Sequence, residues 1–143
     1  MARQAARVEL VPTQPPTIRE RARLLVLAQQ NPVIREEIRQ RCREDPAWFC
    51  NFACWTFDSR EENPHIPFIL YDYQVTLIRW YEERFRNKES GIVLKSRDMG
   101  ASWCAMVWLL WHWLFTPGFQ ALIGSRTEEL VDNRLIDSHF GRL

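Results

Sequence analysis

The sequence lacks an apolar run long enough to cross a membrane. A bilayer-spanning helix needs about 20 apolar residues. The most apolar stretch, Ala101 to Phe115, is shorter than this and is interrupted by Ser102 and His112. We therefore expect no membrane span.

The sequence also lacks the closely spaced cysteine pairs of a zinc ribbon and any signal peptide. Its four cysteines, Cys42, Cys50, Cys54 and Cys104, form no CxxC pair, which predicts buried thiols in a reducing, cytosolic compartment. Cys50 and Cys54 have a spacing that can bind metal on a helix, so a zinc site that adds His65 or His112 stays open.

Strong net charge is absent as well, because the total is only +1. The charge is unevenly distributed, however. Residues 1–43 carry nine arginines and four glutamates, whereas residues 44–143 carry ten basic and fourteen acidic side chains. The basic N-terminal part suits nucleic acid or an acidic partner, and a solvated helical face is the alternative.

The N-terminal third of the chain predicts a leader followed by short helices. Residues 1–16 contain three prolines and little periodicity, as is typical of a flexible leader. An Arg-rich helical region, residues 17–45, follows, and Asn31-Pro32 ends one helix and begins the next. Asp45-Pro46 repeats this start signal before the aromatic segment Trp48 to Trp55, which predicts a third helix; Thr56 to Leu70 is predicted to be a loop.

In the remaining sequence the spacing of the apolar residues alternates between helical and strand-like, which predicts an α/β fold. A helix from Tyr73 to about Asn87 precedes the β-branched run Gly91 to Leu94, which is typical of a buried parallel strand. A second strand is predicted at residues 120–124, after the helix 101–115, and a capping box at Ser125 and Glu128 predicts a last helix over residues 126–135. The expected fold class is a P-loop NTPase parallel sheet with flanking helices, truncated after its first strands and preceded by the N-terminal helices.

The segment between the first predicted strand and the helix 101–115 matches the frame of a phosphate-binding loop. The frame GxxxxGK[ST] is occupied by Lys95-Ser96-Arg97-Asp98-Met99-Gly100-Ala101-Ser102. Gly100 and Ser102 stand where the motif requires them, while lysine stands at the first position instead of the seventh. Backbone N–H groups and the helix dipole would face the phosphates, Ser102 would hold Mg²⁺, and Lys95 would reach the β- and γ-phosphates from the other end of the loop. A turn that merely contains Gly and Ser is the alternative.

A glutamine at the start of the preceding helix is a second candidate. Tyr73-Gln74 follows Asp72, and the Gln74 amide offers both a donor and an acceptor to the edge of adenine. Gln74 could equally be an ordinary polar residue at a helix start.

Three blocks of sequence together resemble the N-terminal ATPase region of the large terminase subunit of tailed bacteriophages. They are the aromatic block from Trp48 to Arg60, the block ending Tyr71-Asp72-Tyr73-Gln74, and the loop Lys95 to Ser102 with its displaced lysine. Ala121 to Arg126 is similar to the next motif of the family. The likeness spans about residues 46 to 133, so residues 46–143 are interpreted as the N-terminal part of a P-loop ATPase domain.

The resemblance implies the activity of a parent protein, ATP-driven packaging of viral DNA, with ATP and Mg²⁺ as cofactors. The implied partners are double-stranded DNA, the portal protein, the small terminase subunit and further copies in a homo-oligomeric ring. The implied location is the host cytoplasm, transiently at the procapsid portal. Lys95 and Arg97 are the candidate catalytic residues, and Arg97 pairing with Asp98 is the alternative for the second. The nucleotide site is expected to comprise Tyr73, Gln74 and residues 95–102, with Ser102 as the magnesium ligand.

In the family, the magnesium-holding and water-activating carboxylates lie further downstream, after an apolar run that this sequence does not contain. A nuclease domain is missing as well. We therefore expect the chain to be a fragment that is inactive alone. Two other functions stay open: a helicase-like nucleic-acid-dependent ATPase, and a non-enzymatic assembly module.

Overall fold

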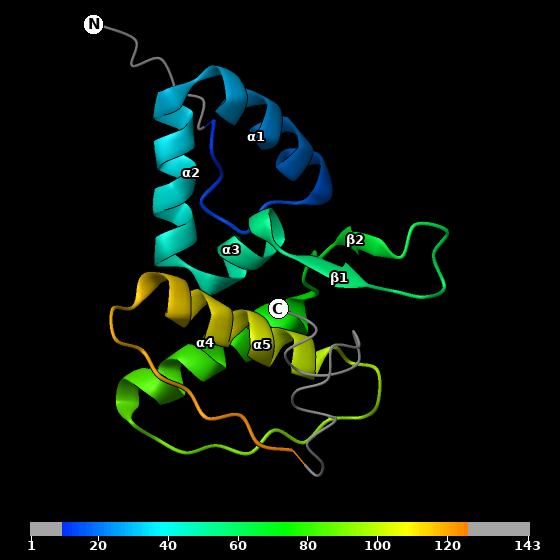
Figure 1. The fold of residues 1–143 in the computed structure, drawn as a ribbon, viewed down its shortest axis with the longest axis vertical. Helices are drawn as coiled ribbons and strands as arrows, with labels where there is room; N and C mark the ends of the chain where they lie inside the picture. The colour runs from blue at the N-terminus through cyan, green and yellow to red at the C-terminus, as the bar shows by residue number, and fades with distance from the viewer. Residues whose placement is uncertain (1–9, 126–143) are drawn as a thin grey trace, which may run out of the picture.

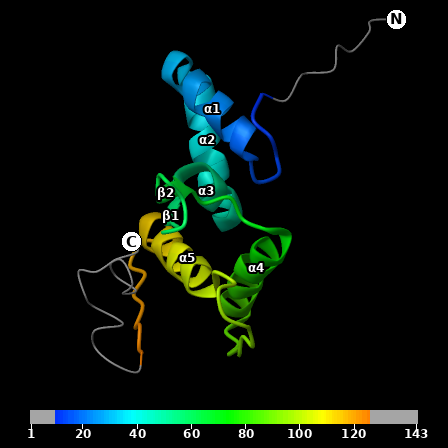
Figure 2. The ribbon, with the colours of Figure 1, turned by 90° about the vertical axis from the view of Figure 1, so that its right-hand side faces the viewer.

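The computed structural model describes residues 10–125 and is mostly helical over that range (Figure 1). Its elements are α1 (Ile18–Gln30), α2 (Pro32–Glu44), α3 (Pro46–Ala53), β1 (Trp55–Phe57), β2 (His65–Pro67), α4 (Asp72–Asn87) and α5 (Ala101–Phe115). The helices form two tiers: α1 and α2 lie in one, α4 and α5 in the other, and α3 lies between them (Figure 2).

The first three helices begin where the sequence predicts. Thr17 and Glu20 form a capping box at the start of α1. The Asn31 side chain accepts hydrogen bonds from the N–H groups of Val33 and Ile34, and the Asp45 side chain accepts one from Ala47. Each Asn or Asp cap is followed by proline at the first helical position, where the missing N–H costs nothing.

The described part of the expected leader, residues 10–16, lies against α3. Val11 and Pro16 are fully buried. Trp48 donates its indole N–H to the carbonyl of Pro12 over 3.0 Å, and Asn51 donates its side-chain amide to the carbonyl of Pro16 over 3.1 Å. Two buried side chains of α3 thus hold this segment in place.

One arginine of the basic N-terminal region is part of the core. Arg21 is only 4% exposed, and its guanidinium donates to the carbonyls of Asn51 and Cys54, over 3.1 and 2.7 Å. It also lies over the ring of Trp55, 4.9 Å from the ring centroid. Burial lowers the pKa of Arg21. This arginine joins α1 to the C-terminal end of α3, so it is not available to a nucleic acid.

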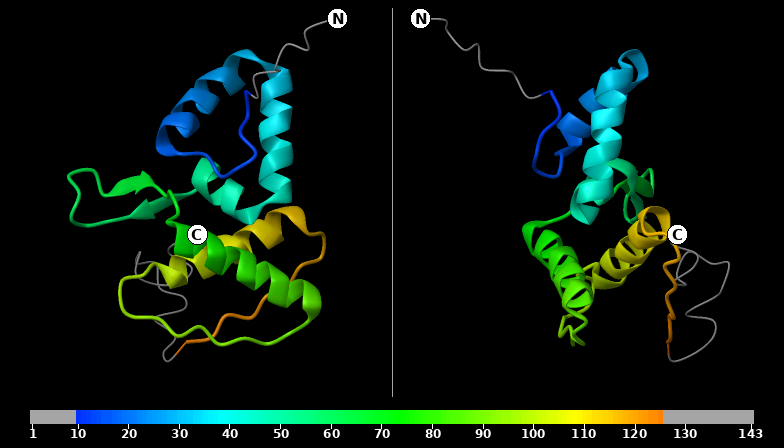
Figure 3. Two further views of the ribbon diagram at one scale, coloured as in Figure 1. Left: turned by 180° about the vertical axis from the view of Figure 1, so that it is seen from behind. Right: turned by 90° about the vertical axis from the view of Figure 1, so that its left-hand side faces the viewer.

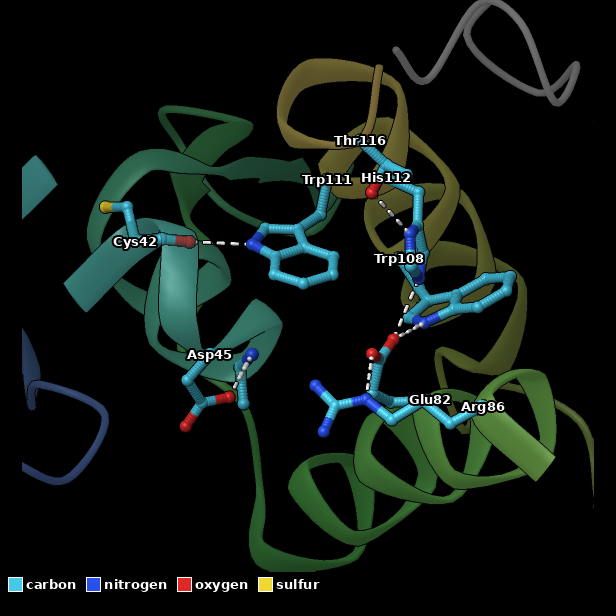
Figure 4. A network of polar contacts seen from close by, with 9 residues as sticks. Cys42, Asp45, Glu82, Arg86, Trp108, Trp111, His112 and Thr116 are labelled. Carbon is cyan, nitrogen blue, oxygen red and sulfur yellow. Dashed lines mark hydrogen bonds and ion pairs between the residues drawn. The ribbon is translucent and has the colours of Figure 1, made fainter. Parts of the chain in front are cut away.

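A polar network joins α4 to α5 (Figure 4), and the rings of Phe85, Trp108 and Phe119 contact its histidine, His112. The Glu82 carboxylate accepts hydrogen bonds from Arg86 Nε, Trp108 Nε1 and His112 Nε2, over 2.7, 3.1 and 2.8 Å. Because a carboxylate only accepts, His112 Nε2 carries a proton, and in the neutral ring Nδ1 accepts from the Thr116 hydroxyl over 3.0 Å. The network satisfies a buried histidine and fixes the orientation of α5 against α4.

Trp111 of α5 connects the tier of α4 and α5 to the tier of α1 and α2. It is 5% exposed and donates its indole N–H to the carbonyl of Cys42 in α2 over 2.6 Å (Figure 4). The apolar core continues through Trp48 and Phe49 of α3 and Ile78 of α4. The core therefore spans both tiers.

The segment that was predicted to be a loop after α3 contains a short hairpin. Strands β1 and β2 are antiparallel, with Trp55 paired to Pro67 and Phe57 to His65. The hairpin extends to one side of the molecule (Figure 3). Strands of three residues are too short to show an alternating pattern, so periodicity alone does not reveal them.

The predicted parallel sheet is wrong. Within residues 10–125 the only sheet is the two-stranded antiparallel hairpin, and neither residues 91–94 nor residues 120–124 are strands. Ile92, Leu94 and Leu122 are 85%, 94% and 100% exposed. A strand needs a hydrogen-bonded neighbour, and neither segment has one in the described chain, so the apolar pattern does not lead to a buried strand. The predicted helix at residues 126–135 lies outside the described residues.

No helix in the described range combines the length and the apolar character needed to cross a membrane.

Candidate nucleotide site

A cavity of about 760 Å³ lies where the hairpin, the start of α4 and the N-terminal end of α5 meet. The hairpin and this end of α5 are on the same side of the molecule (Figure 1). Seven of the predicted site residues line the cavity: Tyr73, Gln74, Lys95, Asp98, Gly100, Ala101 and Ser102. Ser96, Arg97 and Met99 do not line it. Residues that are 20 or more positions apart in sequence are thus brought to one place.

The N-terminal end of α5 faces this cavity without a side-chain cap. Gly100 is the N-cap residue, in the left-handed conformation with φ +69°, and no side chain accepts a hydrogen bond from the first turn. The backbone N–H groups of that first turn have no acceptor within the helix, and the helix dipole adds a partial positive charge. Ala101 and Ser102 lie in this turn, and both line the cavity. The arrangement suits an anion.

Gln74 fastens the loop to α4. Its side chain is almost completely buried, at 4% exposed. Nε2 donates to the carbonyl of Met99 over 3.0 Å, and Oε1 accepts from the N–H of Tyr71 over 3.0 Å. A Cβ atom on Gly100 would lie 2.5 Å from Nε2. The loop can approach Gln74 this closely only because residue 100 is glycine.

Two tyrosines form an exposed edge of the cavity. The rings of Tyr71 and Tyr73 are stacked, with centroids 5.7 Å apart and planes 9° from parallel. Tyr73 also donates its hydroxyl to the carbonyl of Met99 over 3.3 Å. The Met99 carbonyl therefore accepts from two adjacent residues of α4, which makes it the main attachment point of the loop.

The charged residues of the loop differ in their positions. Lys95 is exposed and lines the cavity, whereas Arg97 is exposed and does not. Asp98 lines the cavity in the left-handed conformation, with φ +59°, which aspartate tolerates better than most residues. In the described structure Arg97 forms no ion pair with Asp98. The catalytic role of Arg97 stays a prediction.

The lining of the cavity also contains a tightly hydrogen-bonded pair that was not among the predicted site residues. Arg60 donates from Nε and Nη2 to the two oxygens of Asp58, over 2.8 and 2.6 Å. These hydrogen bonds lower the pKa of Asp58 to about 2. The sequence signal is the Asp-Ser-Arg triplet at the end of the aromatic block, but nothing in its spacing places it beside the loop.

The four cysteines are buried in the core. All four are buried free thiols, and the described part of the chain contains no group of three or more potential histidine, cysteine or acidic ligands. Burial raises the pKa of Cys42 and of Cys104 to about 12, which keeps both thiols protonated. The structure therefore gives no support to zinc held by Cys50 and Cys54.

The site thus combines an uncapped helix start, a lysine, a hydroxyl, two exposed aromatic rings and an arginine around one cavity. Such a set can bind a nucleotide through its phosphates, with the aromatic rings available to the base. Comparison of the chain with protein-family models, with curated proteins and with solved structures gives no match.

Proposed function

We propose that this chain binds MgATP in the cavity described above and is the nucleotide-binding part of a viral DNA-packaging terminase large subunit. The observation that carries the proposal is the meeting of two sequence motifs at one cavity: the Tyr73-Gln74 pair lines it together with Lys95, Asp98 and Gly100 to Ser102 of the loop, where α5 begins without a side-chain cap. Sequence motifs that are far apart would converge in this way if they served one ligand. The parent protein would use the ATP to move double-stranded DNA into a procapsid.

The phosphates would bind at the N-terminal end of α5. The N–H groups of its first turn would donate to phosphate oxygens, and the Lys95 ammonium would supply the nearest positive charge from the loop. Gly100 keeps this approach open because it carries no side chain. Lys95 acts here as an electrostatic contact and needs no proton transfer.

Magnesium fits the same site through Ser102. Its hydroxyl belongs to the first turn of α5, is partly exposed and lines the cavity. Mg²⁺ usually keeps several waters and uses one or two protein ligands together with phosphate oxygens. A single hydroxyl beside the phosphate-binding end of a helix is consistent with that preference. When bound, the ion would neutralise phosphate charge.

Gln74 can contribute in two ways, and they are experimentally distinct. As an adenine reader, its amide would have to leave Met99 and Tyr71, to which it is now hydrogen-bonded. As a loop anchor, it holds the Met99 carbonyl and thereby the phosphate-binding backbone. Gln74→Ala should weaken ATP and GTP binding equally if it is an anchor, and should remove a preference for ATP if it reads the base.

The proposal is tested by nucleotide binding to the 143-residue chain. The chain contains only two lysines, Lys88 and Lys95, and Lys88 lies at the C-terminal end of α4, outside the cavity. Lys95→Ala should weaken MgATP binding by roughly tenfold, a value reduced from that of a buried contact because Lys95 is exposed. Lys88→Asn is the matched control, since asparagine also tolerates the left-handed backbone found there (φ 56°).

Equal affinities for the two variants and the unsubstituted chain would contradict the assignment of Lys95. We expect negligible steady-state ATP turnover from all three proteins, because the family's water-activating carboxylates are not in this sequence.

A further inference from the structure

The turn of the hairpin faces the same cavity as the proposed phosphate loop. Asp58, Ser59 and Arg60 line one wall, and Lys95, Gly100 and Ser102 line another. The charged lining residues are therefore two cations, Arg60 and Lys95, and two anions, Asp58 and Asp98. With Arg60 held by Asp58, Lys95 is the one lining cation of the described residues without an acidic partner within ion-pair distance.

The partnership between Arg60 and Asp58 is local and accessible to solvent. The two residues are separated by one position, and the Arg60 side chain is 86% exposed. Besides the side-chain contacts, the N–H of Arg60 donates to Asp58 Oδ1 over 3.1 Å, so the carboxylate also shapes the turn. Exposed ion pairs contribute little to stability, because water and salt compensate both charges when they separate. The guanidinium can therefore exchange partners at small cost.

A second carboxylate is within electrostatic reach of Arg60. The pKa of Arg60 is raised, mainly by its hydrogen bonds and charge interaction with Asp58, and to a smaller extent by the charges of Asp98 and of the neighbouring Glu61. Asp98 belongs to the loop that carries Lys95, so the hairpin turn and this loop both place charged side chains in the lining of one cavity. An anion bound between them would lie near the Arg60 side chain.

We propose that Arg60 is a second phosphate-binding residue of this site, which exchanges the carboxylate of Asp58 for the outer phosphates of the bound nucleotide. This inference rests on the proposed function, because it assigns a residue to the same ligand. The planar guanidinium donates two parallel hydrogen bonds to a phosphate as it does to a carboxylate, and a polyphosphate carries more charge than the carboxylate it replaces. Asp58 then acts as a competitor that sets how readily Arg60 is released.

The exchange predicts opposite effects for the two partners. Arg60→Ala removes the phosphate contact and should weaken MgATP binding by about fivefold. Asp58→Asn keeps an oxygen for the turn but removes the charge that holds Arg60, and should strengthen binding by about threefold. If the pair had only a structural role, both substitutions would break the same contact and would change the affinity in the same direction.

The experiment measures the binding of MgATP and of Mg-tripolyphosphate by calorimetry to five proteins: the unsubstituted chain, Arg60→Ala, Asp58→Asn, the double variant, and the control Arg39→Ala. Arg39 is also exposed and paired to a carboxylate, Glu36 at 3.2 Å, but lies on α2 and does not line the cavity. Circular dichroism and thermal melting establish that each variant is folded.

We expect the gain in affinity from Asp58→Asn to disappear in the double variant, and Arg39→Ala to leave the affinity unchanged. The affinities for tripolyphosphate should follow the same pattern. A gain that persists when Arg60 is alanine would mean that Asp58 acts only by repulsion, and would overturn the exchange. If the Arg60→Ala and Arg39→Ala variants bind MgATP with equal affinity, the exchange is also overturned, while the role of Lys95 is unaffected. If the unsubstituted chain binds neither ligand, the proposed function fails together with the inference.

Discussion

Gly100→Ala should be unusually destabilising for a substitution that adds one methyl group. The backbone at residue 100 has φ +69°, and an L side chain in this region costs about 1 kcal/mol. The added Cβ would also lie 2.5 Å from Gln74 Nε2, closer than any real contact. Gln74 is a flexible side chain, but it is 4% exposed and hydrogen-bonded at both ends of its amide. Displacing it would lose two hydrogen bonds, at about 1 kcal/mol each.

The total expected cost is therefore about 3 kcal/mol in the free energy of unfolding. Gly118→Ala is the matched control, since Gly118 has φ +72° and no atom within 4 Å of an added Cβ. It should cost only the backbone contribution, about 1 kcal/mol. Urea unfolding followed by tryptophan fluorescence measures both, because the chain has seven tryptophans.

A double variant isolates the contact. In a Gln74→Ala background the clash is absent, so the additional cost of Gly100→Ala should fall to that of Gly118→Ala. If Gly100→Ala and Gly118→Ala cost the same in the unsubstituted chain, the close approach between the loop and Gln74 is refuted.

Two further predictions concern the core. Burial raises the pKa of Glu82, but hydrogen bonds from Arg86, Trp108 and His112 outweigh it and place the pKa below the ordinary value of 4.5. The Glu82 carboxylate therefore stabilises the fold above that pH, and this contribution is lost as the pH falls through the folded-state pKa. Glu82→Gln should make the free energy of unfolding, measured by urea unfolding, fall less steeply with decreasing pH. An equally steep fall in the variant and in the unsubstituted chain would contradict this. The four buried cysteines should react slowly with a thiol reagent at pH 8 in the folded chain and rapidly in urea, and rapid reaction of the folded chain would show that the thiols are accessible.

Local signals in the sequence predicted the helices well, because caps act over only a few residues. Thr17, Asn31 and Asp45 each satisfy N–H groups two or three positions ahead, so the information that begins a helix is contained in its own first turn. These elements need no knowledge of the rest of the fold.

The predicted sheet failed because a strand depends on partners that are distant in sequence. Residues 91–94 have the composition of a buried strand, yet Ile92 and Leu94 are exposed and unpaired to any strand in residues 10–125. Composition reports what a segment could bury and does not report whether a neighbour is present to cover it. The placement of residues 10–16 was also not predictable, because Trp48 and Asn51, more than 30 positions away, donate hydrogen bonds to the carbonyls of Pro12 and Pro16.

The candidate site was predicted only in part from the sequence. The loop motif and the Tyr73-Gln74 pair were identified separately, and the structure brings both to one cavity. Whether Gln74 reads a base or anchors the loop depends on its contacts with Met99 and Tyr71, which residue types do not reveal. Asp58 and Arg60 were missed as site residues because their place on the wall results from the hairpin.

The most direct test of the central claim is affinity labelling with an ATP analogue whose terminal phosphate carries an aldehyde that condenses with lysine. The chain offers two lysine side chains, Lys88 and Lys95, and only Lys95 lines the cavity. After borohydride reduction and peptide mapping, we expect the label on Lys95 in clear preference to Lys88, and we expect excess MgATP to protect Lys95. Equal labelling of the two lysines, or labelling of Lys95 that MgATP does not reduce, would contradict nucleotide binding at this site.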